Sequence, residues 1–127
     1  MQSQFAFLCD AVNITQNNLF NVLGGGIEKF HLSQLPQNRP VALLLRIEYN
    51  PITENGDHVI EIRIIDCDGQ NKISPALLNV SFPPQVRTFN IVTNMIPRFD
   101  RYGMHSVEVA VDRHHIVSIP LNVIERI

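Results

Sequence analysis

The chain is poor in cysteine, because only Cys9 and Cys67 occur among its 127 residues. Two thiols are too few for a disulfide framework, and the first residues lack the basic segment that opens a secretion signal. Apolar runs are short, since none approaches the ~20 residues that a membrane-spanning helix needs. We therefore expect a cytoplasmic protein without a membrane partner, whose cysteines are free thiols that behave as small buried hydrophobic residues.

An excess of charge of one sign is also missing. Ten lysines and arginines stand against twelve aspartates and glutamates, which gives a formal net charge of -2. A chain this close to neutral has no electrostatic footprint for nucleic acid or for an anionic membrane surface. We therefore expect no nucleic-acid partner.

Internal repeats and low-complexity segments are absent, which removes support for a solenoid or a disordered tail. Hydrophobic residues make up 45% of the chain. That share is enough to fill one sizeable core, so residues 1–127 are expected to form a single domain.

The pattern that is present is an alternation of apolar and polar side chains. It is clearest where Val107, Val109 and Val111 alternate with polar or small residues. A connection over 112–115 leads to a second run with the same period, which predicts a β-hairpin. No segment shows the stripe of an amphipathic helix. The return strand carries Val117, Ile119, Leu121 and Val123.

The N-terminal part is predicted to begin with a strand over Phe5–Ile14. Both of its faces are apolar, so the strand is expected to be central in a sheet. Leu19–Leu23 is expected to be its antiparallel partner. The run Gly24, Gly25 and Gly26 then indicates a bulge or a sharp corner, because only glycine enters the positive-φ regions at little cost. One face carries Phe5, Phe7, Cys9 and Ala11, and the other carries Ala6, Leu8 and Val12.

Further strands are predicted between segments rich in turn residues. The total of about eight or nine strands, spaced roughly 8 to 12 residues apart, predicts an all-β fold and an antiparallel β-sandwich. Apolar residues of the strand over 41–49 alternate from Val41 to Tyr49, which places them on one face. The other strands are expected at 30–32, 58–64, 73–82 and 89–95, with loops at 33–40, 50–57 and 97–103.

Four segments of the chain carry a common pattern: Phe5–Ala11, Asn18–Gly26, Gly103–Asp112 and Ile119–Val123. Together they resemble a family of small uncharacterised bacterial proteins. The resemblance implies an immunoglobulin-like, Greek-key sandwich of unknown function and carries over no catalytic residue. The chain departs from the family pattern at His105, where an aromatic residue is usual, and at Arg113, where glycine is usual. The second departure suggests a longer turn built on His114 and His115.

Asp10 and a pair of aspartates are the acidic candidates for a site. A carboxylate within an apolar strand must be hydrogen-bonded, paired or placed at the surface. Asp10 either binds a metal or substrate or accepts backbone N–H groups near the glycines, and we favour the second interpretation. Asp66 and Asp68, joined by Asp112 or Asp100, could supply oxygen ligands to calcium. Such a site needs six to eight oxygens, so a hairpin turn is the favoured interpretation.

The histidines and serines also raise the question of chemistry. His114 and His115 suggest zinc or general-base chemistry, with His31, His58 and His105 elsewhere in the chain. Neighbouring residues of a strand point to opposite faces, so a solvated turn is favoured and no metal is expected. Ser106 and Ser118 lie in strands without a nucleophile elbow, and neither cysteine has a nucleophile motif. We therefore expect no enzyme activity and no cofactor.

Two functional hypotheses remain. The first is a non-enzymatic β-sandwich module that acts through protein–protein contacts, as a homo-oligomer or as an accessory subunit, with an edge near Pro83-Pro84 as the docking site. The second is a small-ligand or anion binder for a metabolite or nucleotide, although the glycines lack the lysine and helix of a phosphate loop. The proposed interface consists of Val80, Phe82, Phe89 and Ile91, and the proposed ligand site of Gly24, Gly25, Gly26, Arg98, Arg101 and His105.

Overall fold

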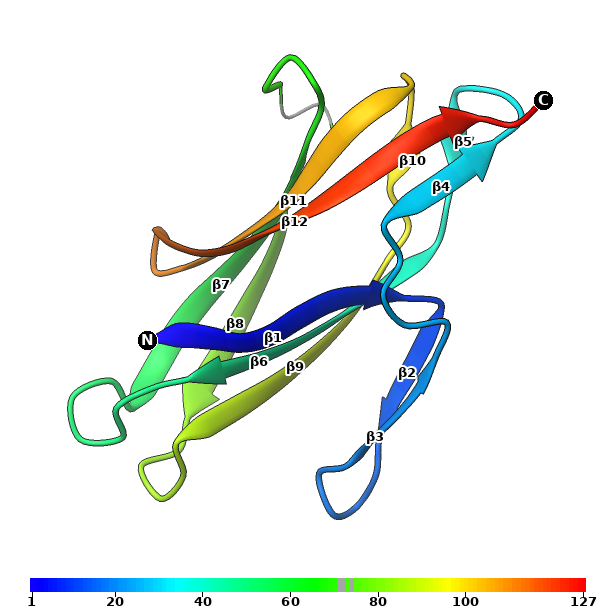
Figure 1. The fold of residues 1–127 in the computed structure, drawn as a ribbon. Helices are drawn as coiled ribbons and strands as arrows, with labels where there is room; N and C mark the ends of the chain where they lie inside the picture. Colours follow the sequence, from blue (N-terminus) through cyan, green and yellow to red (C-terminus); the bar gives the residue numbers. More distant parts are fainter. Residues whose placement is uncertain (71–72, 74) are drawn as a thin grey trace.

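The computed structural model describes residues 1–70, 73 and 75–127, in which the chain forms strands and turns without a helix (Figure 1). The all-β prediction is therefore confirmed. Nothing in these residues is a helix long and apolar enough to cross a membrane. The twelve strands of the described part are β1 (Gln2–Cys9), β2 (Ala11–Ile14), β3 (Phe20–Leu23), β4 (Lys29–Leu32), β5 (Gln37–Asn38), β6 (Val41–Glu48), β7 (Gly56–Ile65), β8 (Ala76–Phe82), β9 (Thr88–Met95), β10 (Arg98–Phe99), β11 (Gly103–Val111) and β12 (His114–Glu125).

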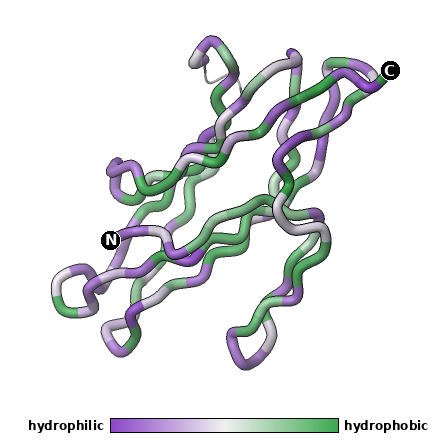
Figure 2. The backbone as a smooth tube through the Cα atoms, viewed as in Figure 1, coloured by the Kyte–Doolittle hydropathy of each residue, from purple (hydrophilic) through white to green (hydrophobic). Residues whose placement is uncertain are grey.

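Two sheets enclose the main core. The smaller sheet has the strand order β1-β6-β9, and the larger sheet has the order β4-β12-β11-β7-β8. Apolar residues recur along the strands of both sheets (Figure 2). Their inward side chains alternate along the strands as the sequence predicts. The core includes Leu8, Leu43, Leu45, Ile47 and Ile91 of the smaller sheet and Ile60, Ile62, Phe82, Val107, Val109 and Leu121 of the larger one.

One strand pair departs from the predicted antiparallel arrangement. β4 pairs with β12 in parallel, with Lys29 opposite Asn122 and Leu32 opposite Glu125. The other described strand pairs are antiparallel. The chain leaves the smaller sheet after β1 and enters the larger sheet at β4, so no tight hairpin constrains the direction of β4.

The predicted strand over 5–14 is in fact two strands, broken at Asp10. The Gly26 N–H donates to the Leu8 carbonyl at 2.9 Å, and the Asp10 N–H donates to the Leu23 carbonyl at 3.0 Å. These bonds bring the glycine corner against the end of β1 and turn the chain. The break also moves Val12 to the face that carries Phe5, and leaves Ala11 exposed, which reverses the predicted faces of these two residues.

The Asp10 side chain is exposed and pairs with Arg39 at 3.2 Å. The expectation that it accepts backbone N–H groups is therefore wrong. Gly24 explains the local geometry, because its φ of 60° and the 2.3 Å between an added Cβ and Asp10 Oδ2 leave no room for a side chain. The corner depends on glycine at this position.

A second, smaller apolar cluster lies on the outer face of the smaller sheet. The hairpin of β2 and β3 packs over this face and buries Leu44. The Arg46 guanidinium lies 5.1 Å from the ring centroid of Phe5 and 5.5 Å from that of Phe20, which are cation–π distances. The cluster contains Cys9, Ala42 and Leu44, with Phe5, Phe7, Val12, Phe20, Val22 and Val92 packed against them.

Both cysteines are free thiols, as predicted. Cys9 is buried, and burial, with a further contribution from Asp10, raises the pKa of its thiol. Cys67 is exposed instead of buried, because it lies in the turn that follows β7.

Twelve strands replace the expected eight or nine partly because two predicted loops contain short strands. β5 and β10 pair with each other as a two-stranded sheet.

The connection between β11 and β12 is shorter than predicted: Asp112 and Arg113 have φ values of 50° and 70°, and Val111 pairs with His114. Two residues with positive φ form a tight hairpin turn of the type I′ class, so the longer turn on His114 and His115 is wrong.

The His58 side chain contacts this turn, the loop after β6 and the core. Its Nδ1 lies 2.5 Å from Asp112 Oδ2, and its Nε2 lies 2.6 Å from the Glu54 carbonyl oxygen. Both partners are acceptors, so both ring nitrogens donate and the ring carries a charge. The ring centroid also lies 4.5 Å from that of Phe82. His58 therefore links two loops to the core.

The protonation of His58 predicts how stability depends on pH. Burial lowers the pKa of His58, but the hydrogen bonds to Asp112 and to the Glu54 carbonyl outweigh burial and raise it above 6.5. A raised pKa in the folded state adds stability that is complete below the unfolded pKa and is lost as the pH rises through the folded pKa. We expect the free energy of unfolding, measured with urea, to fall from pH 6 to pH 9 in the wild type.

The His58→Phe variant keeps a ring against Phe82 and cannot be charged, so this decrease should be smaller in it. His31→Phe serves as the control, because it removes an exposed histidine elsewhere. An equal decrease in His58→Phe and the wild type would contradict the assignment.

Candidate functional site

One lateral side of the fold is almost free of charge. Between Ile73 and Ile96 the sequence contains a single charged residue, Arg87. This stretch supplies β8, β9 and the loop 83–87 that joins them, and β8 and β9 each end their sheet. We call the free edges of these two strands, with their connecting loop, the β8–β9 side. Exposed surface normally carries charged residues, so their scarcity here marks this side of the molecule.

The edge at β8 is long and carries no charged residue. β8 has seven residues, Ala-Leu-Leu-Asn-Val-Ser-Phe, and hydrogen-bonds β7 on one side. At the opposite end of the same sheet, β4 has four residues and includes Lys29. Short length and a lysine are features that protect an edge strand from pairing with another chain, and β8 has neither.

Large apolar side chains are exposed around this side. The exposed fraction is 63% for Leu77 on β8, 45% for Val86 in the connecting loop and 70% for Ile96 after β9. Scattered apolar residues are ordinary on a surface, but apolar residues gathered where charge is scarce are typical of a contact surface.

A cleft of about 220 Å³ opens between the two sheets at the β8–β9 side. Its lining is mostly apolar and includes Ile64 of β7, Ala76 of β8 and Met95 of β9. Thr93 also lines it, with 8% of its surface exposed, and its hydroxyl has no hydrogen-bond partner among residues 1–70, 73 and 75–127. A buried polar group without a partner lowers the stability of the folded state, so we expect the Thr93 hydroxyl to be destabilising.

A wider groove of about 1040 Å³ lies on the outer face of the larger sheet, next to β8. Its apolar lining includes Val59, Leu77 and Ala110, and charged residues such as Arg63 and Arg113 line it as well. Because Leu77 belongs to both features, the groove continues the β8–β9 side onto the outer face of the sheet.

Glu108, His115 and Ser118 form a polar cluster at this groove. His115 Nε2 lies 2.9 Å from Glu108 Oε2 and 2.8 Å from Ser118 Oγ. Partial burial raises the pKa of Glu108, but hydrogen bonds from Ser118, His115 and Ser106 outweigh it, so the pKa lies below its usual value. The carboxylate is therefore ionised at neutral pH.

The cluster does not have the geometry of a nucleophilic triad. In a triad, the serine gives its proton to one ring nitrogen of histidine and the carboxylate holds the other. Here Ser118 donates to Glu108, and the carboxylate and the serine meet the same nitrogen of His115. The three side chains therefore hold an ionised carboxylate beside the groove, and this geometry does not activate Ser118 as a nucleophile.

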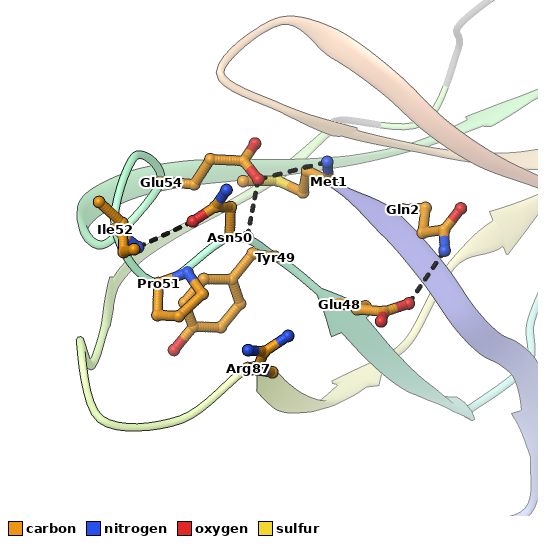
Figure 3. A pocket seen from close by; sticks show the side chains of 9 residues that line it. All are labelled: Met1, Gln2, Glu48, Tyr49, Asn50, Pro51, Ile52, Glu54 and Arg87. Carbon is orange, nitrogen blue, oxygen red and sulfur yellow. Dashed lines mark hydrogen bonds and ion pairs between the residues drawn. The ribbon is translucent and has the colours of Figure 1, made fainter.

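A third hollow, of about 430 Å³, surrounds the turn after β6 (Figure 3). Asn50 Oδ1 accepts the Ile52 N–H at 2.9 Å, and Glu54 Oε1 accepts the Asn50 N–H at 2.9 Å. The bond from Asn50 lowers the pKa of Glu54. The Met1 amino group lies 3.4 Å from the same Glu54 oxygen. These polar groups hold the turn together, so we assign no ligand to the hollow.

The predicted interface residues lie on β8 and β9, and their side chains point toward the core. Phe82 and Ile91 are 1% and 5% exposed, and both belong to the main core. Val80 and Phe89 are half-buried and pack against that core. Their side chains point between the sheets because the alternation of β8 and β9 places them inward, so Phe82 and Ile91 are not surface residues.

The residues of the predicted ligand site contact other parts of the protein. His105 is buried, with Nδ1 3.0 Å from the Gly103 carbonyl oxygen and its ring against Phe99. Arg101 pairs with Asp66 and Asp68. Arg98 belongs to β10 and pairs with Asn38 of β5. In contrast, Gly24 lies against Asp10, and Gly25 against Val22 and Phe7.

The aspartates stabilise turns and link neighbouring segments of the fold. Asp66 Oδ1 accepts the N–H groups of Asp68 and Gln70 at 2.9 and 3.0 Å. These bonds are those of the predicted hairpin turn. Asp112 holds His58, and Asp100 is exposed. Within residues 1–70, 73 and 75–127, no three histidine, cysteine, aspartate or glutamate side chains gather as a metal site would require.

Sequence reasoning missed Leu77, Thr93 and Ile96. A signal for this surface was present in the printed sequence, because the gap in charge from Ile73 to Ile96 covers two consecutive strands. Thr93 could not be found in this way, since its missing hydrogen bond depends on the packing of β7 against β9.

These features define an all-β protein whose two facing sheets expose one uncharged lateral side. The chain belongs to a family of unknown function, DUF6941, whose sequence model matches residues 4–124. No curated protein matches the chain.

Solved structures show a similar arrangement of strands. An alkylpurine DNA glycosylase, AlkC, from Pseudomonas fluorescens, solved with DNA that contains an abasic-site analogue, has a TM-score of 0.51 and 11% identity over 94% of this chain and 30% of the glycosylase. A β-glucosidase from Listeria innocua has a TM-score of 0.48 and 13% identity over 96% of this chain and 16% of the glucosidase. The chain therefore spans less than a third of either protein, and the likeness to the glycosylase concerns the fold alone.

The missing partner of the Thr93 hydroxyl leads to a stability prediction. Thr93→Val replaces the hydroxyl with a methyl group of similar size, which removes an unsatisfied buried polar group that costs about 1–3 kcal/mol. We expect the free energy of unfolding to rise by about 1 kcal/mol in chemical denaturation. Thr53→Val, at an exposed loop position, should change it by less than about 0.5 kcal/mol. A loss of stability in Thr93→Val would show that the hydroxyl has a partner after all.

Proposed function

We propose that this protein is a non-enzymatic interaction module that binds another polypeptide through its β8–β9 side. The observation that carries the proposal is the coincidence of two free sheet edges with the near absence of charge between Ile73 and Ile96. Specific protein contacts exclude charge from their centre and bury apolar residues there. Leu77, Val86 and Ile96 supply such residues.

The free edges provide a second source of binding energy. An edge strand presents a row of unpaired backbone N–H and C=O groups, and an added strand satisfies them with main-chain hydrogen bonds. A long, uncharged edge such as β8 is prone to aggregation unless a specific partner covers it. A partner strand would use the backbone of β8 for affinity and Leu77 for specificity.

The strand order supports an immunoglobulin-like interpretation of the two sheets. In variable-type immunoglobulin domains, the sheet that holds the last strand is extended by added strands next to the third one. Here the larger sheet contains the last long strand, β12, with its hairpin partner β11, and continues through β7 to β8. In this interpretation β8 is an added edge strand. A cytoplasmic location, which two free thiols favour, is part of the same proposal.

Site-specific photo-crosslinking tests the proposal. A photoreactive amino acid placed at Leu77 or at Ile96 should form covalent adducts with another polypeptide in the cells that make this protein, because both positions face the partner. Ile52 is the matched control, since it is 85% exposed but belongs to the turn after β6. We expect at least several-fold more adduct from Leu77 and Ile96 than from Ile52, with the joined peptides identified by mass spectrometry. Equal yields from the three positions would contradict the proposal.

A further inference from the structure

We propose that the polypeptide bound at the β8–β9 side is a second copy of this chain, joined by antiparallel pairing of β8 with the partner subunit's β8 about a two-fold axis at Asn79. This inference rests on the proposed function and names its partner. It follows from three properties of β8: its free edge, the alternation of its side chains and its lack of charge.

The first property is the free edge. All seven residues from Ala76 to Phe82 pair with β7, from Ile62 to Gly56 in the antiparallel register. β8 is the last strand of its sheet, so no strand of the described residues pairs with its other edge. At about 3.3 Å per residue this edge is about 23 Å long, which is enough for a complete strand-to-strand contact.

The second property is the alternation of exposure along β8. Leu77, Asn79 and Ser81 are exposed on the outer face, while the residues between them are half-buried or buried on the inner face. Residues directly opposite each other in an antiparallel pair share a face, so only registers that keep this alternation are allowed.

Pairing centred on Asn79 meets this condition and uses the whole strand. It places Leu77 opposite Ser81 on the outer face, and Leu78 opposite Val80 on the inner face. Ala76 then lies opposite Phe82, so all seven residues have a partner. Shifting the centre by one residue keeps the faces but pairs fewer residues, and the two sheets joined at Asn79 would form one continuous ten-stranded sheet.

The third property is charge. Two copies that each carry a formal net charge of -2 repel each other over most of their surfaces. β8 contains no charged residue, so the contact brings no like charges directly opposite one another. The exposed Leu77 of each copy lies beside Ser81 of the partner subunit on the outer face. The outer-face groove beside β8 then extends across the two-fold axis.

Asn79 gives a sharp test, because it lies on the axis and one substitution places two identical charges opposite each other. Asn79→Lys and Asn79→Glu should each weaken the dimer at least tenfold, measured by sedimentation velocity of the purified protein. An equimolar mixture of the two variants should form a heterodimer, since lysine then faces glutamate. Asn13→Lys, at an exposed position of β2, is the matched control and should dimerise as the wild type does.

The outcomes separate this inference from the proposed function. A wild-type protein that stays monomeric at high concentration, or an Asn79→Lys variant that dimerises normally, overturns the inference. If a different protein is then crosslinked from Leu77, the interaction surface stands with another occupant. If nothing is crosslinked from Leu77 or Ile96, both proposals fail. Recovery of dimers only in the mixture supports pairing at Asn79, and unchanged circular dichroism of each variant shows that the fold is intact.

Discussion

The burial of β6 on both faces is the constraint on which the rest of the fold depends. Its residues Val41 to Leu45 are all buried. One face closes the main core against the larger sheet, and the other face needs a separate cover, which the β2–β3 hairpin supplies. The strand also pairs with β1 and β9 on its two edges, so it has no free backbone. Because β6 is fully occupied, the unsatisfied edges of the molecule lie elsewhere, at the ends of the sheets.

The alternation of apolar and polar residues predicted the strands that form the core. The features that it did not predict depend on contacts between residues far apart in the sequence. The hairpin of β11 and β12 and the inward face of β6 follow directly from a two-residue period. The break at Asp10 does not, because it needs Leu8 and Leu23 to meet the glycine corner through backbone hydrogen bonds. The parallel pairing of β4 with β12 and the lone hydroxyl of Thr93 likewise arise only when distant segments pack.

The candidate site shows the same division. The sequence predicted a docking site on β8 and β9, but it treated Phe82 and Ile91 as surface residues, whereas the alternation turns them inward. Residues proposed for an anion site have partners that the sequence did not predict, such as Asp68 for Arg101. The β8–β9 side is distinguished by its lack of charge, because Arg87 is the one charged residue among the 23 positions from Ile73 to Met95. The period of the apolar residues carries no information about charge.

If another chain covers the edge of β8, the backbone amides of this strand gain a partner and exchange more slowly with solvent. Hydrogen–deuterium exchange of the peptide that spans residues 76–82, followed by mass spectrometry at low and at high protein concentration, measures this effect. We expect exchange in this peptide to slow as the concentration rises, while exchange in the β2–β3 hairpin stays constant. The same exchange rate in β8 at every concentration would show that no second copy covers this edge.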